Sequence, residues 1–160
     1  MKNMVIASTK KTPEIIFKTS GDLMISGNSL PTNSDSFYQP IMAWIEELVA
    51  TSPKNISIVF DLEHVNTSST RIILQILRTL NGFKKGKGKG NLTIVWNYDK
   101  EDKDMLEQGE TLQQILDRPF EFIEKESWQN GFTVEKNYLF SDVNGKEFDL
   151  DNLIFTYQIR

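Results

Sequence analysis

The stretch from Asn55 to Leu80, NISIVFDLEHVNTSSTRIILQILRTL, changes its hydrophobic period in the middle. Its first part contains a short apolar run from Ile56 to Phe60, rich in β-branched and aromatic residues, which is typical of a strand covered on both faces. In its second part apolar residues recur every three or four positions, which predicts an amphipathic helix. The helix positions are Ile72, Ile73, Ile76, Leu77, Leu80 and Phe83.

Between the strand and the helix lies a four-residue corner, Asn66-Thr67-Ser68-Ser69. Asn, Ser and Thr are the preferred N-cap residues, so capping alone explains this composition at most helix starts. Three consecutive hydroxyls nevertheless exceed what one cap needs. The free N–H groups and the positive dipole end of a helix also suit a phosphate, so a modified hydroxyl stays open as a second interpretation.

Composition narrows the class of protein. A chain of 160 residues with 39% apolar and 25% charged residues is expected to form one globular domain with a sizeable core. A net charge of −4 argues against nucleic acid as the main partner, because phosphate backbones select basic surfaces. The chain has no cysteine, and it shows neither a signal peptide nor a run long enough to span a bilayer. We therefore expect a cytoplasmic protein without membrane insertion.

The remaining patterns predict a mixed β-sheet with flanking helices, an α/β protein with the order β-β-α-β-α-β-α-β. After a polar lead-in to about Thr12, the expected elements are a hairpin of Glu14–Lys18 and Asp22–Ser26, a helix from Phe37 to about Ala50, the strand and helix described above, a strand at Leu92–Trp96, an acidic helix within Asp99–Glu126 that breaks near Gly109, and a strand at Phe120–Ile123. Residues Lys84–Gly90, four lysines and three glycines, are expected to form a flexible solvated connector.

The last part of the chain, Ser127–Arg160, has a different hydrophobic pattern from the rest. Phe132–Phe140 and Phe148–Ile159 alternate like strands on either side of Asn144-Gly145, a strong hairpin pattern. We therefore divide the chain into a domain of residues 1–126 and a C-terminal β extension, residues 127–160, packed on the same domain.

Catalytic and metal-binding patterns are weak. The single histidine, His64, would have to act with Ser68 or Ser69 in a small hydrolase, yet no G-x-S-x-G nucleophile elbow is present. The glycines near Lys87 lack the Lys-Ser/Thr of a phosphate-binding loop, and the acidic residues around Asn144 fail the spacing of a calcium loop. We expect no cofactor, no metal and no enzymatic activity, and keep the hydrolase as a remote alternative.

Several short motifs, taken in order, resemble the SiaC family of regulatory phosphoproteins over about Thr12–Glu126. The most specific is Asn66-Thr67-Ser68-Ser69 at a helix start. The others include Thr12-Pro13-Glu14-Ile15, Gly27-Asn28-Ser29-Leu30-Pro31, Trp96-Asn97-Tyr98 and Pro119-Phe120. The segment from Ser127 onward is not part of the resemblance.

The resemblance implies a fold like that of STAS-type anti-sigma-factor antagonists and a function as a non-enzymatic phospho-switch. It implies phosphorylation of Thr67, with Ser68 and Ser69 as alternates, by a cognate GHKL-type Ser/Thr kinase, and reversal by a metal-dependent phosphatase. The unphosphorylated form is then expected to bind and regulate a diguanylate cyclase. A STAS-type antagonist that controls transcription by partner switching is the alternative.

The expected partner surface surrounds the corner. Arg71, Gln75 and Arg78 follow at i, i+4 and i+7, so they share the polar side of the helix. Together with the loop Leu30-Pro31 they complete the candidate set of partner-binding residues, whose other members are Asn66, Ser68 and Ser69.

Overall fold

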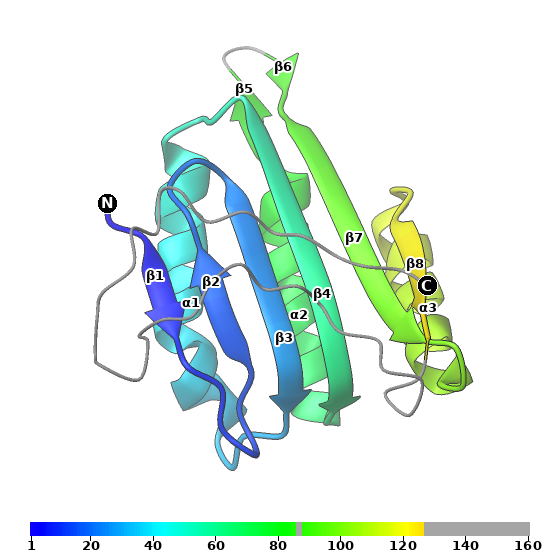
Figure 1. Ribbon diagram of the computed structural model, residues 1–160. Coiled ribbons are helices and arrows are strands. Elements are labelled where there is room, and N and C mark those ends of the chain that lie inside the picture. The colour runs from blue at the N-terminus through cyan, green and yellow to red at the C-terminus, as the bar shows by residue number, and fades with distance from the viewer. Residues whose placement is uncertain (86–87, 127–160) are drawn as a thin grey trace.

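The computed structural model describes residues 1–85 and 88–126, which form one α/β unit (Figure 1). In chain order the elements are β1 (Met4–Ile6), β2 (Glu14–Phe17), β3 (Asp22–Ser29), α1 (Ser34–Ala50), β4 (Asn55–Val65), α2 (Thr67–Asn81), β5 (Lys84–Lys85), β6 (Gly88–Lys89), β7 (Asn91–Asp99), α3 (Lys103–Leu116) and β8 (Glu121–Lys125). This arrangement confirms the predicted mixed sheet with flanking helices.

The main sheet has six strands in the order β1-β2-β3-β4-β7-β8. β1, β2 and β3 pair antiparallel, and β3, β4, β7 and β8 pair parallel. The hairpin of β2 and β3 was predicted, whereas β1 was not, since Met4–Ile6 lies in the expected polar lead-in. With three residues, this edge strand is too short to show a period of two, and its pairing with Ile15–Phe17 defines it.

All three helices lie on one face of the sheet, behind it in Figure 1. Their apolar sides pack against alternate strand residues and form one core. α2 buries the predicted face, whose residues Ile72, Ile73, Ile76, Leu77 and Leu80 are all at most 2% exposed. The core also includes Phe17, Ile25, Trp44, Phe60, Trp96, Met105 and Phe120.

Most predicted ends shift by a few residues, and two differences from the prediction bear on the site and the core. β4 extends to Val65 and α2 begins at Thr67, so the corner consists of Asn66 alone and the three hydroxyls form the first turn of the helix. The predicted break near Gly109 is wrong, because α3 continues through it. A Cβ on Gly109 would lie 2.5 Å from Cδ1 of Trp96, so this glycine lets the helix approach the sheet closely.

Part of the lysine- and glycine-rich segment forms regular structure. Lys84–Lys85 pairs with Gly88–Lys89 as a short antiparallel ladder, seen at the top of Figure 1. Gly90 then carries the chain past Phe83, whose ring would lie 1.9 Å from a Cβ at that position. Four of its residues, Lys84, Lys85, Gly88 and Lys89, therefore belong to a paired ladder, which the sequence did not predict.

The predicted C-terminal hairpin lies outside the described residues. Within 1–85 and 88–126, no helix combines the length and the apolar character needed to cross a membrane.

Candidate functional site

The start of α2 is shaped by the side chain of Asn66. Its backbone is extended, with φ −83° and ψ 166°, and its Oδ1 accepts a hydrogen bond from the backbone N–H of Ser69 at 2.9 Å. The same oxygen accepts a bond from the Ser68 hydroxyl at 3.1 Å. This is the N-cap that the sequence predicted, and it satisfies one of the four backbone donors left free at a helix start.

The Ser69 hydroxyl belongs to the interior. Ser69 is 0% exposed, and its oxygen accepts a hydrogen bond from Ser29 at 2.8 Å. Ser29, at the end of β3, also bonds to the hydroxyl of Tyr38 on α1 at 2.7 Å. These three hydroxyls connect β3, α1 and α2, so Ser69 holds the two helices and the strand in register.

Tyr38 remains neutral in this network. Burial raises the pKa of its hydroxyl to about 12, and its hydrogen bonds with Ser29 and Ser69 only partly oppose this effect. The network is therefore one of uncharged hydroxyls at neutral pH.

The Ser68 hydroxyl is half-buried and already engaged. It lies 2.6 Å from the hydroxyl of Ser34, the first residue of α1, in addition to its bond to Asn66. Ser68 thus joins the starts of the two helices, and a phosphoryl group on it would displace both contacts.

The Thr67 hydroxyl differs from the other two. Thr67 is exposed, and its side chain makes no hydrogen bond with any residue that the structure describes. Of the three consecutive hydroxyls, it is the one that an external enzyme reaches without disturbing a contact.

The surroundings of Thr67 are supplied by α1 and by the loop after β3. Arg71, one turn further along α2, forms a 2.9 Å ion pair with Asp35 near the start of α1. Both side chains are exposed, at 53% and 78%, so the pair contributes at most about 1 kcal/mol and is readily exchanged. The loop also contacts the cap, since the Asn66 N–H donates to Ser29 O at 3.0 Å and its side-chain amide lies 3.5 Å from Pro31 O.

The predicted partner residues divide into two groups. Leu30, Pro31, Asn66, Ser68, Ser69 and Arg71 gather around the start of α2, although Pro31 and Ser69 are buried. Gln75 and Arg78 are exposed but lie further along the helix. At about 1.5 Å per residue they are roughly 12 and 16 Å from Thr67 along the helix axis, so they extend the exposed stripe away from the corner.

Sequence reasoning missed a groove between α2 and α3. It has a volume of about 600 Å³, and its lining includes Thr70, Arg71, Leu74, Asp104, Glu107 and Ile115. Ile115, a large apolar residue in this lining, is 50% exposed. The sequence contained one indication of this groove. α3 has two apolar residues, Leu106 and Ile115, besides those that it buries in the core.

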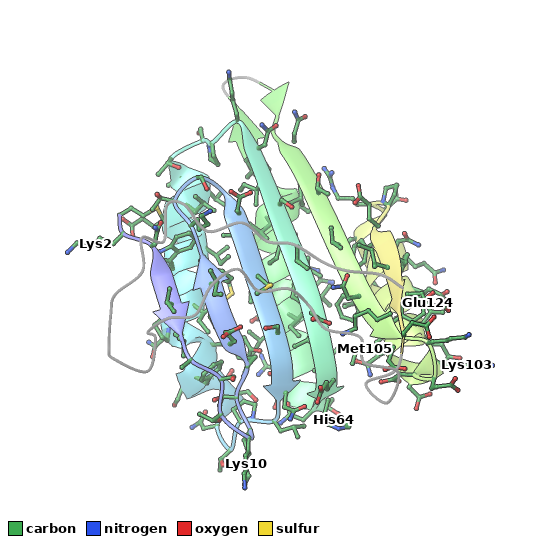
Figure 2. The ribbon with its side chains drawn as sticks, in the orientation of Figure 1. Lys2, Lys10, His64, Lys103, Met105 and Glu124 are labelled. Atoms are coloured by element: carbon green, nitrogen blue, oxygen red, sulfur yellow. The ribbon has the colours of Figure 1, made fainter. Side chains whose placement is uncertain are left out.

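The structure does not bring His64 together with Ser68 or Ser69 as the hydrolase alternative requires. His64 is exposed near the end of β4 (Figure 2), and no hydrogen bond among the described residues joins it to Ser68 or Ser69. Those serine hydroxyls instead bond to Ser34, Asn66 and Ser29. Nor do the described residues contain a cluster of three His, Cys, Asp or Glu side chains that could hold a metal ion.

Known proteins resemble this chain over about three quarters of its length. An uncharacterized protein of Pseudomonas aeruginosa strain UCBPP-PA14 is 26% identical over 121 residues, which are 75% of this chain and 94% of that protein. Apo-SiaC of P. aeruginosa superimposes with a TM-score of 0.66 at 26% identity, over 79% of this chain and all of that one.

A third similar structure is a complex. The crystal structure of the diguanylate cyclase SiaD with its activator SiaC, also from P. aeruginosa, contains a chain that matches with a TM-score of 0.69 at 25% identity. The match covers 76% of this chain and 98% of that one. The model of the SiaC family regulatory phosphoprotein matches residues 6–125. This chain belongs to the SiaC family of regulatory phosphoproteins.

Proposed function

We propose that this protein is a non-enzymatic phospho-switch whose acceptor is Thr67. One observation carries the choice of residue: of the three hydroxyls in the first turn of α2, Ser69 is buried, Ser68 bonds to Ser34 and Asn66, and Thr67 is exposed and unengaged. A kinase therefore modifies Thr67 without opening the interface between α1 and α2.

The fold tolerates a phosphate at this position. The group adds about −1.5 to −2 charges and several strong acceptor oxygens at neutral pH. The first turn of α2 contains no acidic residue, and its free N–H groups and dipole favour an anion. Arg71 lies four residues after Thr67, on the same side of the helix. The scaffold keeps its structure while the surface at the corner becomes strongly negative.

We assign the modification to a cognate GHKL-type Ser/Thr kinase and its removal to a metal-dependent phosphatase, as the family resemblance implies. The exposed position of Thr67 supports both steps, because each enzyme must surround the hydroxyl or the phosphate. The same exposure leaves the modified residue available to a downstream partner.

That partner, we propose, is a diguanylate cyclase, bound and regulated by the unphosphorylated form. Support comes from the likeness to the complex of SiaD with its activator SiaC. The docking surface comprises Thr67, Leu30 in the loop that the buried Pro31 supports, and the exposed stripe Arg71, Gln75 and Arg78. A phosphate at the head of that stripe weakens binding, because it repels acidic partner groups and is costly to desolvate at an interface.

The acceptor is tested with the cognate kinase, ATP and peptide mapping by mass spectrometry. The wild type should take up one phosphate, on Thr67. Thr67→Ala should take up none, and Ser68→Ala, as the matched control, should still be modified. Phosphate on Ser68 in the wild type, or uptake by Thr67→Ala, would remove Thr67 from this role.

The partner is tested by co-purification from the native host with wild type and with Thr67→Glu. A diguanylate cyclase should accompany the wild type and be depleted with Thr67→Glu. Recovery of an anti-sigma factor in its place would favour the antagonist function that controls transcription.

A further inference from the structure

The helix-free face of the sheet has an apolar row of its own. Register places Val5 opposite Ile16, Ile16 opposite Met24, Met24 opposite Val59, and Val59 opposite Val95. The row crosses five of the six strands at one level. None of these side chains belongs to the core beneath the helices.

Such a row requires a cover. Sheets made only of parallel strands are almost always covered on both faces, and in the parallel part of this mixed sheet β3, β4 and β7 carry apolar residues on both faces. The apolar run of β4 has the composition of a strand buried on both sides. In Figure 1, however, α1, α2 and α3 all lie behind the sheet, and no described helix or strand lies in front of it.

The same face carries one charge pair. Asp61, two residues after Val59 on β4, forms an ion pair with Lys125 on β8. Two opposite charges that neutralise each other are the kind of group that a covering segment can tolerate.

We propose that the chain's own C-terminal extension, residues 127–160, docks on this helix-free face and covers the apolar row. The extension follows β8 directly, and Lys125, in the last position of β8, already directs its side chain over this face toward Asp61. The chain therefore enters the extension beside the surface that needs covering.

Length and composition fit this occupant. Six strands about 4.8 Å apart make a sheet roughly 24 Å wide, which about eight extended residues can cross. The extension is several times longer, and it contains four of the ten phenylalanines, Phe132, Phe140, Phe148 and Phe155. It also lies beyond the part of the chain that the family model matches, which ends at residue 125.

The docking face is separate from the switch. Thr67 begins α2 on the opposite side of the sheet, so the extension covers one layer and leaves the corner free for kinase and partner. If the extension does not dock on this face, the proposed phospho-switch is unaffected. If Thr67 is not the acceptor, the docking proposal is likewise unaffected.

The first test uses the absence of cysteine from the chain. Single variants of the full-length protein, Val59→Cys in the row and Thr93→Cys at an exposed position on the same face, are treated with a maleimide. Val59→Cys should react at least about tenfold more slowly than Thr93→Cys, independently of protein concentration. Equal rates would show an open face and overturn the proposal.

The second test identifies the occupant. A benzophenone maleimide on Thr93→Cys is photoactivated, and cross-linked peptides are mapped by mass spectrometry. The expected product is an intramolecular link to a peptide from residues 127–160. Ala43→Cys, exposed on α1 in the opposite layer, serves as the control and should not capture that segment.

Other occupants give other results. A link between two copies, with labelling of Val59→Cys that slows as concentration rises, would assign the face to a dimer and contradict the proposal. The double substitution Phe148→Ser and Phe155→Ser in the extension gives another check. If Val59→Cys still reacts slowly in that variant, and no cross-link to the extension is found, the proposal is also contradicted. The predicted result of that combination is faster labelling of Val59→Cys.

Discussion

Replacing the buried and the exposed hydroxyl of the same helix turn should have unequal effects on stability. Ser69→Ala removes a fully buried oxygen that accepts a 2.8 Å hydrogen bond from Ser29. Ser29 keeps its bond to Tyr38, so the expected loss is about 1–2 kcal/mol rather than the full penalty of an unsatisfied buried group. Thr67→Ala removes an exposed, unbonded hydroxyl and should change stability by less than about 0.5 kcal/mol.

Urea denaturation followed by circular dichroism measures both variants against the wild type. Ser69→Ala should lower the midpoint without changing the slope, and should lower Tm by roughly 3–8 °C for a domain of this size. Thr67→Ala should overlay the wild type. If Thr67→Ala proves as destabilising as Ser69→Ala, the distinction between a structural and a free hydroxyl is wrong.

Three further predictions concern the supports of the site. Gly109→Ala should destabilise by about 1 kcal/mol in thermal melts, because overpacking against Trp96 costs more than the helix propensity gained; a raised Tm would contradict this contact. Asn66→Ala should cost about 1 kcal/mol through loss of the cap, measured by urea denaturation, and an unchanged midpoint would refute the capping role. The raised pKa of Tyr38 makes the folded state hold its proton longer than the unfolded state. Stability should therefore fall by about 1.4 kcal/mol per pH unit as pH rises from 10 toward 12, and Tyr38→Phe should remove that part of the slope; identical slopes would exclude it.

The parts of the fold that sequence reasoning recovered are those specified locally. The apolar spacing of α2 and the dense apolar run of β4 lie within single stretches, so their type and order could be read from composition and period. β1 could not, because three residues carry no period and pairing with β2 defines the strand. The continuity of α3 through Gly109 depends on Trp96, which comes from β7.

The candidate site shows the same division. The sequence pointed to the hydroxyls of residues 67–69 and to a cap by Asn66. It could not rank those hydroxyls by accessibility, because Ser69 is buried by contacts with Ser29 and Tyr38, about 30 to 40 residues earlier in the chain. The choice of Thr67 came from the family resemblance, and the geometry now supplies a physical reason for it.

The central claim is that charge on Thr67 changes recognition while the scaffold persists. The most direct test is the Kd for the diguanylate cyclase, measured by titration calorimetry with the same preparation before and after stoichiometric phosphorylation. Phosphorylation should raise Kd at least about tenfold, which corresponds to about 1.4 kcal/mol, with little change in Tm. An unchanged or lower Kd for the phosphorylated form, with the phosphate located on Thr67, would contradict the account.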